Sequence, residues 1–224
     1  MGLIQLPELS ILDILSVALI YGIPSLLVNL LLPYKITDKQ LIETTQQFNS
    51  LKMNDKLFLG LLKEQTFYEI DDDISTIIFG NLKAKNTITI FSNPHCAPCA
   101  RMHQKIEKLL EDTNNQFRVQ YILSSFDNTL DSSCEFFLYV DEKYPIEKRN
   151  QIYHEWFDKG KYDKENFFKR YAYPADNNVS PKYQKHLEWK RKMKMQATPT
   201  VLFDGYELPE MYFQQIEKLF FLQI

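Results

Sequence analysis

The sequence predicts an α/β domain that contains a helical insertion and is preceded by a transmembrane helix and a helical linker. Three features lead to this prediction: an apolar run of bilayer length, two alternating runs that flank a helical pattern, and helical spacing throughout residues 132–196. The boundaries that follow are a membrane-spanning segment at 1–36, a linker at 37–70 and a folded domain at 71–224, with its insertion at about 132–196.

Composition sets the class of protein. With 224 residues, 16 Phe and 13 Tyr, the chain is long and aromatic enough for one domain with a packed core. A net charge of −3 gives no basic surface, so we predict no nucleic-acid partner. The three cysteines form one close pair plus Cys134, which excludes a small scaffold held by several disulfides. We expect Cys134 to be a small buried side chain.

Residues 11–32 predict one transmembrane helix. Asp13 is the only charge in the run, and about 20 apolar residues span a bilayer core. A secretory signal peptide fits less well, because residues 1–10 contain no Lys or Arg and no small-x-small cleavage site precedes Pro33. An apolar core hairpin broken at residues 22–24 is the alternative.

The linker is expected to contain one or two amphipathic helices. Thr37 and Asp38 offer a plausible N-cap, and apolar residues recur at helical spacing up to Leu62. The polar face lacks the basic residues of an interfacial membrane helix, so we interpret this segment as a spacer that packs on the domain.

A closely spaced cysteine pair follows the first long strand. The alternating run at 87–91 ends at Asn93 and Pro94, and a helical pattern starts at Cys96. A sulfur at the first turn of a helix lies near unpaired N–H groups and the positive end of the helix dipole, which favours a thiolate. Cys96 is therefore the predicted nucleophile, and Cys99, one turn further, the resolving thiol. Pro98 is tolerated because first-turn N–H groups have no helical partner.

The rest of the domain follows from strand and helix patterns. Residues 117–124 alternate as a second strand, and a strand, helix and strand of this length imply parallel pairing. Breaks at Pro and Gly divide the insertion into helices near residues 133–143, 146–159, 164–171 and 181–195. A third strand follows residue 197, a turn at Asp204 and Gly205 leads into a hairpin, and a last helix begins at Pro209.

Thr198 and Pro199 stand at the start of the third strand. A proline there removes a ladder donor, and a cis peptide bond would make a tight corner. Such a corner would present the backbone N–H and C=O of Thr198 beside the cysteine pair, as an edge for an extended substrate peptide.

Taken together, these motifs resemble the thioredoxin superfamily over residues 74–224. The helical insertion is similar to that of the DsbA-like branch. Residues 93–103 and 197–210 look most like the thioredoxin-like domain attached to bacterial vitamin K epoxide reductase homologues, in which a membrane helix bundle hands electrons to quinone. The resemblance implies a thioredoxin-like fold, Cys96 as nucleophile, Cys99 as resolving thiol and Pro199 as the cis-proline.

Two departures from the family pattern matter. Many relatives carry a buried acid six residues before the first cysteine, and here that position is Ile90. Proton transfer from Cys99 must then use water or another group. The membrane segment contains no cysteine, so a separate partner is required to pass electrons to quinone.

The predicted function is thiol–disulfide exchange on extracytoplasmic proteins, with no cofactor beyond the redox-active cysteine pair. We assign Cys96, Cys99 and Pro199 to catalysis and Thr198, His95 and Pro98 to substrate binding. The predicted partners are protein thiols or disulfides and a membrane redox protein of the vitamin K epoxide reductase type. We expect the redox domain to face the periplasm or another extracytoplasmic space, although Lys35 and Lys39, by the positive-inside rule alone, favour the cytoplasm.

Metal binding is the alternative function. The soft donors His95, Cys96, Cys99, Met102 and His103 lie close together in sequence and suit Cu(I) or Zn(II). A structural zinc site normally needs four ligands, however, and a packing role for His103 is commoner. We therefore assign no metal ligand. A c-type haem signature is absent because Ala100 follows the second cysteine.

Overall fold

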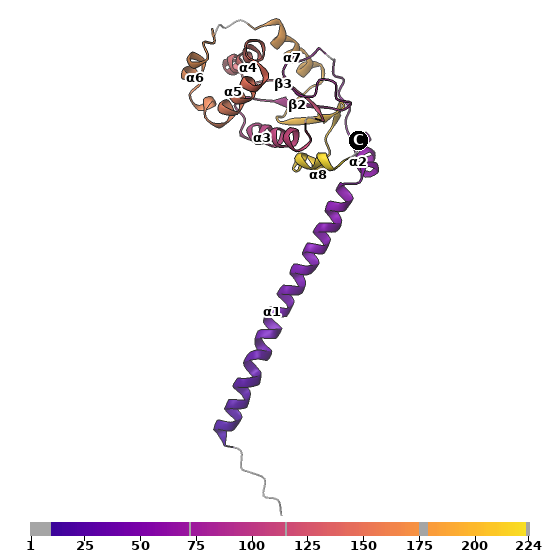
Figure 1. The fold of residues 1–224 in the computed structure, drawn as a ribbon, viewed down its shortest axis with the longest axis vertical. Coiled ribbons are helices and arrows are strands. Elements are labelled where there is room, and N and C mark those ends of the chain that lie inside the picture. The colour runs from indigo at the N-terminus through magenta and orange to yellow at the C-terminus, as the bar shows by residue number, and fades with distance from the viewer. Residues whose placement is uncertain (1–9, 72, 115, 175–178, 223–224) are drawn as a thin grey trace, which may run out of the picture. The chain divides into compact units, whose positions relative to one another are not determined.

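The computed structural model describes residues 10–71, 73–114, 116–174 and 179–222, and Figure 1 shows the chain. The chain divides into two compact units, residues 1–51 and 52–224. The first nine residues of the predicted membrane-spanning segment lie outside the described residues.

The first unit is dominated by one long helix, α1 (Ile11–Lys52). Residues 11–31 have a mean hydropathy of 2.2 and are long and apolar enough to cross a membrane. The hairpin alternative is wrong, because the helix runs without a break through residues 22–24 and its apolar side chains over residues 11–31 are exposed. The predicted new helix start at Thr37 is also wrong. A proline inside a helix removes one ladder hydrogen bond, and here α1 continues past Pro33.

The second unit begins with α2 (Asp55–Lys63) instead of at residue 71. The side chain of Asn54 caps this helix by accepting a hydrogen bond from the Leu57 N–H at 3.0 Å. Phe58 and Leu62 of α2 are buried in the domain core. The later part of the predicted linker is therefore an integral part of the domain.

Within the described residues, five strands form one mixed sheet in the order β1-β3-β2-β4-β5. Their bounds are β1 Ile78–Gly80, β2 Thr87–Ser92, β3 Arg118–Leu123, β4 Thr200–Phe203 and β5 Tyr206–Glu207. Strands β2 and β3 are parallel, as predicted, whereas β1, β4 and β5 each run antiparallel to the neighbour they pair with. Asp204 and Gly205, both with positive φ, form the turn between β4 and β5.

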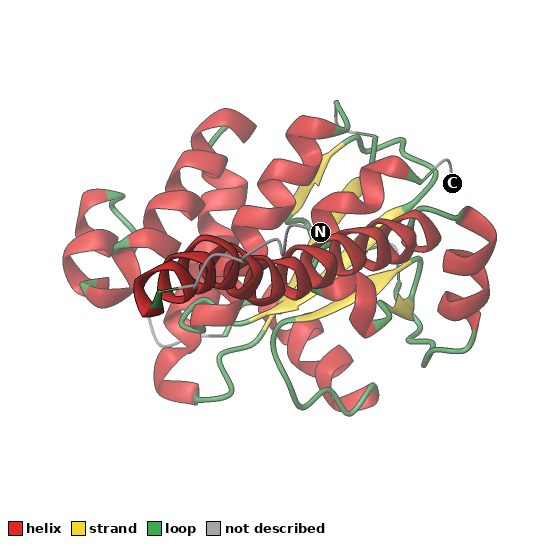
Figure 2. Ribbon diagram, turned by 90° about the horizontal axis from the view of Figure 1, so that it is seen from below, coloured by secondary structure: helices red, strands yellow, loops and turns green. Residues whose placement is uncertain are grey.

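Helices lie on both faces of this sheet (Figure 2). Helix α3 (Ala97–Asp112) connects β2 to β3. The insertion contains the four predicted helices, α4 (Asp131–Lys143), α5 (Ile146–Asp158), α6 (Lys164–Arg170) and α7 (Pro181–Lys192), with short 3₁₀ turns at Asn128–Leu130 and Gly160–Tyr162. The last predicted helix is only one turn, α8 (Glu210–Phe213), followed by the 3₁₀ helix η3 (Ile216–Phe221).

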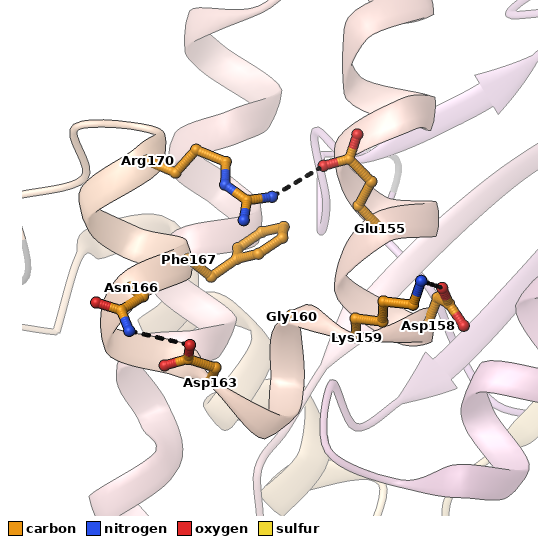
Figure 3. Close-up of a pocket in the computed structure, with 8 residues that line it drawn as sticks. All are labelled: Glu155, Asp158, Lys159, Gly160, Asp163, Asn166, Phe167 and Arg170. Carbon is orange, nitrogen blue, oxygen red and sulfur yellow. Dashed lines mark hydrogen bonds and ion pairs between the residues drawn. The ribbon is translucent and has the colours of Figure 1, made fainter.

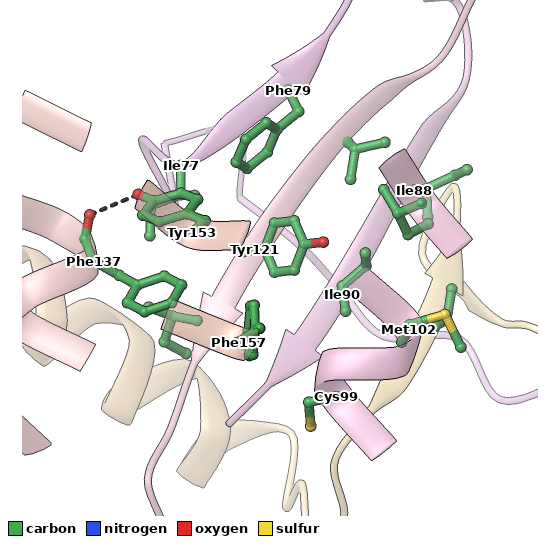
Figure 4. Close-up of a cluster of buried hydrophobic side chains, with 14 of the residues drawn as sticks. Ile77, Phe79, Ile88, Ile90, Cys99, Met102, Tyr121, Phe137, Tyr153 and Phe157 are labelled. Carbon is green, nitrogen blue, oxygen red and sulfur yellow. Dashed lines mark hydrogen bonds between the residues drawn. The ribbon is translucent and has the colours of Figure 1, made fainter. Parts of the chain in front are cut away.

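The alternation of the strands creates a core on each face of the sheet. The larger core contains Ile88 and Ile90 of β2 together with side chains of α2 to α6 and the C-terminal segment (Figure 4). On the other face Phe91, Ile122 and Leu202 pack with Trp189 of α7. The central strand β2 is thus covered on both faces, and its C-terminal end leads into the turn that carries Cys96 and Cys99.

Candidate active site

Cys96 is the N-cap of α3. Its backbone is extended, and its Sγ accepts a hydrogen bond from the Cys99 N–H at 3.2 Å. The side chain is only partly buried, and Pro98 in the first turn is exposed. Cys96 therefore offers a sulfur at the positive end of the α3 dipole, within reach of another protein.

Cys99 is turned inward and is 1% exposed. Its Sγ accepts a hydrogen bond from the Asn93 N–H at 3.4 Å. Burial, and next the neighbouring Cys96 sulfur, raise the pKa of Cys99 to about 12, against the opposing effect of the Asn93 N–H. The structure has all three cysteines of the chain as free thiols.

The peptide bond between Thr198 and Pro199 is cis. Pairing of β4 with β2 brings this segment beside the cysteines, because Thr200 lies opposite Phe91 near the end of β2. The Cys96 Sγ lies 3.6 Å from the Thr198 carbonyl oxygen, across 102 positions of sequence. Cys96, Cys99, Thr198 and Pro199 are therefore together in one place.

His95 lies on the insertion side of this site. Its Nε2 is 2.7 Å from the Ser133 Oγ, and its ring packs edge-on against Trp156 with 5.5 Å between centroids. Burial, followed by the charges of Lys164 and Lys161, lowers the pKa of His95. His95 is thus held against the insertion, next to the cysteine turn.

Sequence reasoning missed Trp156 and Ser133, which hold the cysteine turn, and the hydrogen bonds that Asn93 makes there. The Trp156 Nε1 donates to the Pro94 carbonyl at 2.9 Å, and Ser133 bonds His95. The Asn93 Oδ1 accepts from the His95 N–H at 2.9 Å, while its Nδ2 donates to the Ser125 carbonyl at 3.0 Å. An Asn before a Pro is a recognisable turn signal, but nothing local in the sequence links the inserted helices to this turn.

The donors of the metal alternative do not come together. His103 is a buried residue of α3, and its Nδ1 lies 2.9 Å from the Tyr121 hydroxyl, whereas the His95 Nε2 lies 2.7 Å from the Ser133 Oγ. Over residues 10–71, 73–114, 116–174 and 179–222, no group of three or more His, Cys, Asp or Glu side chains could hold a metal ion. Ile90, six residues before Cys96, is 1% exposed and packs in the larger core.

A pocket of about 370 Å³ between α5 and α6 lies in the insertion and is lined by none of the predicted site residues (Figure 3). Its charged groups pair with each other: Arg170 lies 3.7 Å from Glu155 and Lys159 lies 3.6 Å from Asp158. Asn166 bonds Asp163 at 3.0 Å. We assign no part of the cysteine chemistry to this pocket.

A mixed sheet whose second strand leads into a Cys-x-x-Cys helix, with a cis Thr-Pro bond beside the cysteines, defines a thioredoxin-like protein. The chain belongs to the thioredoxin family, whose sequence model matches residues 72–219. No curated protein sequence matches the chain.

Solved structures share the fold. Oxidised BdbD from Bacillus subtilis is 15% identical with a TM-score of 0.53, over 70% of this chain and 96% of its own. ScsC from Proteus mirabilis is 18% identical with a TM-score of 0.54, over 91% and 96% of the two chains. The thiol-disulfide oxidoreductase MdbA from Corynebacterium diphtheriae is 13% identical with a TM-score of 0.51, over 69% and 95%. At this level of identity the likeness shows a shared fold, and the thioredoxin-like fold that the sequence predicts is confirmed.

Proposed function

We propose that this protein is a thiol–disulfide oxidoreductase that exchanges disulfides with protein substrates through Cys96 and Cys99. The observation that carries the proposal is the position of the Cys96 sulfur. It caps α3, is partly exposed, and lies 3.6 Å from the carbonyl oxygen of Thr198. A peptide that aligns with Thr198 in strand fashion would bring its own sulfur to Cys96.

In the reducing direction, the Cys96 thiolate attacks one sulfur of a substrate disulfide and the other substrate sulfur leaves as a thiolate. Cys99 then loses its proton and attacks Cys96, which releases the second substrate sulfur and leaves a Cys96–Cys99 disulfide. Two electrons pass to the substrate, and substrate oxidation is the reverse. Because Cys99 has a raised pKa, its deprotonation accompanies the second step.

The membrane context is part of this proposal. The apolar run at residues 11–31 would anchor the protein, with the redox domain on the extracytoplasmic side. The cysteines of the chain lie at positions 96, 99 and 134, and none lies in the apolar run. We propose a membrane redox partner of the vitamin K epoxide reductase type, in keeping with the sequence resemblance.

Trapping of mixed disulfides tests the exchange chemistry. The full chain with Cys99→Ser, in membranes, should accumulate covalent adducts with substrate proteins through Cys96, because the resolving thiol is missing. The same chain with Cys96→Ser should form none, and Cys134→Ser is the matched control that should leave the adducts of the Cys99→Ser protein unchanged. Adducts that persist after loss of Cys96 would refute the assignment.

A redox titration then gives the direction of exchange. The full chain in detergent is equilibrated with glutathione buffers, and the Cys96–Cys99 couple is read by alkylation and mass spectrometry. A reduction potential of about −120 mV marks an oxidant, and one of about −270 mV marks a reductant. Alkylation of Cys96 in intact cells by a membrane-impermeant maleimide tests the extracytoplasmic orientation. If Cys96 is labelled in lysates but not in intact cells, the proposed orientation is wrong.

A further inference from the structure

A small pocket lies at the end of β2 and β3 away from the cysteines, and its volume is about 170 Å³. Strand alternation places its polar side chains on the face of the sheet that also carries Phe91 and Ile122. Opposite positions of the two parallel strands supply them: Thr87 and Thr89 of β2, Arg118 and Gln120 of β3. The floor of the pocket is therefore a polar part of the central sheet.

The segment between α2 and β1 forms an apolar wall of the pocket. Phe67 and Ile70 of this segment line it. The Tyr68 N–H donates to the Gly205 carbonyl at 2.8 Å, which ties the segment to the turn between β4 and β5. Phe67 also packs against Tyr206, with 4.9 Å between ring centroids. Backbone and ring contacts thus hold this wall in place beside the sheet.

Gln120 brings an unsatisfied acceptor to the pocket. The side chain is 2% exposed, and its Nε2 donates to the Thr89 Oγ1 at 2.8 Å. Its Oε1 is buried and has no hydrogen-bond partner within the part of the chain that the structure describes. A buried amide oxygen without a donor is costly, so a ligand that supplies an N–H or O–H group is favoured here.

Arg118 brings a positive charge that no neighbour engages. It lies two residues before Gln120 on β3, on the same face of the sheet, and is half-buried. Its guanidinium group makes no hydrogen bond or ion pair with residues 10–71, 73–114, 116–174 or 179–222. A guanidinium group can hold a carboxylate with two parallel hydrogen bonds, so a carboxylate is the ligand group that suits it best.

Two carboxylates complete the charged lining, Asp71 and Asp204. Both side chains are exposed, so they lie at the mouth of the pocket. Asp204 is held in position, because its Oδ1 accepts from the Thr87 N–H at 2.7 Å and its Oδ2 from the Asn86 Nδ2 at 2.8 Å. These carboxylates repel a simple anion, and Arg118 repels a simple cation. A molecule with both charges fits the lining better than either.

We propose that this pocket binds a free α-amino acid with a small apolar side chain. The carboxylate pairs with Arg118, and the ammonium group donates to the Gln120 Oε1 and faces the carboxylates at the mouth. The side chain lies against Phe67 and Ile70. At about 30 Å³ of liquid volume per water molecule, the cavity has room for about six waters, which is about the size of such an amino acid. The site is separate from the cysteine turn, so this inference goes beyond the proposed exchange.

Calorimetric titration of the full chain in uncharged detergent with L-valine tests the site. Saturable binding with one site per chain is expected. L-Valinamide lacks the carboxylate and isovalerate lacks the ammonium group, so each should bind about tenfold or more weakly through the loss of a hydrogen bond to a charged group. Glycine should also bind more weakly than L-valine, because it has no side chain to place against the apolar wall.

Variants identify the contacts. Arg118→Gln and Gln120→Leu should each weaken L-valine binding about tenfold or more. Arg101→Gln changes an exposed arginine of α3 outside the pocket and is the matched control, which should leave the affinity unchanged. Thermal melts confirm that each variant folds. Saturating L-valine should raise the melting temperature of the unaltered and Arg101→Gln proteins more than that of the Arg118→Gln protein, because a ligand stabilises only the state that binds it.

Three results would overturn the proposal. They are the absence of saturable L-valine binding, equal affinities for the Arg118→Gln and Arg101→Gln proteins, and binding of L-valinamide or isovalerate as tight as that of L-valine. None of these readouts uses a thiol. Failure of this proposal therefore leaves the proposed exchange function intact, and failure of disulfide trapping leaves this site intact.

Discussion

His186 should make the stability of the domain fall steeply in mild acid. The side chain is fully buried on α7, and its Nδ1 accepts a hydrogen bond from the Leu123 N–H at 3.2 Å. Burial lowers the pKa of His186 from 6.5 to about 4. Protonation would also place a proton on the nitrogen that accepts this bond, so the folded state strongly prefers neutral imidazole.

The sign follows from proton binding in the two states. Between pH 6.5 and 4 the unfolded chain binds the proton and the folded domain does not, so His186 contributes full stability above pH 6.5 and loses it as the pH falls toward 4. The whole difference of 2.5 pH units corresponds to about 3.4 kcal/mol. Between pH 8 and pH 5 the expected loss from this residue is about 2 kcal/mol.

Urea unfolding of the full chain in detergent, followed by tryptophan fluorescence from pH 8 to pH 5, measures this loss. The His186→Gln protein retains an acceptor for the Leu123 N–H but does not titrate, so its stability should fall by about 2 kcal/mol less over this range. His95, whose pKa is also lowered, is present in both proteins and cancels in the comparison. Parallel pH profiles for the two proteins would refute the reasoning.

Three further predictions concern the fold and the third thiol. Gly80 has φ of +74°, and a Cβ there would collide with the Phe117 carbonyl oxygen, so Gly80→Ala should lower the free energy of unfolding in urea by about 1 to 3 kcal/mol. Gly60 lies in open space within α2, so Gly60→Ala should raise the free energy of unfolding by about 0.5 to 1 kcal/mol. Equal effects would contradict this. Trp156→Phe removes the hydrogen bond to the Pro94 carbonyl in the cysteine turn and should lower the free energy of unfolding by about 1 to 3 kcal/mol. An unchanged urea midpoint would argue against that contact. Burial holds the pKa of the Cys134 thiol well above its usual range, so iodoacetamide should label it only after unfolding, and rapid labelling of the folded protein by mass spectrometry would disprove its burial.

Much of the fold could be predicted because its signals are local. The β2 strand, the cysteine helix, the parallel β3 strand and the four inserted helices each show a periodic pattern bounded by Pro, Gly or Asn. The position of Thr198 beside Cys96 was predicted from a cis corner at the start of the third strand together with the resemblance, since no local pattern joins residues 102 positions apart.

What sequence reasoning missed was decided by contacts distant in sequence. Phe58 belongs to the core only because β4 and α8 present surfaces to α2, where it packs edge-on against Phe203 and Tyr212. Trp156 and Ser133 resembled ordinary core and surface residues of the insertion, yet they fix the turn before Cys96. The continuity of α1 was missed because Thr37 and Asp38 were interpreted as the N-cap of a new helix.

The two tryptophans of the chain give the domain a built-in optical label on each face of its sheet. Trp156 lies in the larger core next to the turn that carries the thiols, and Trp189 lies in the smaller core, where its indole donates to the Glu69 carbonyl at 2.8 Å. Replacing either one with Phe leaves a single emitter. Spectra of the two single-tryptophan proteins during oxidation would therefore separate events near the sulfur atoms from events on the opposite face.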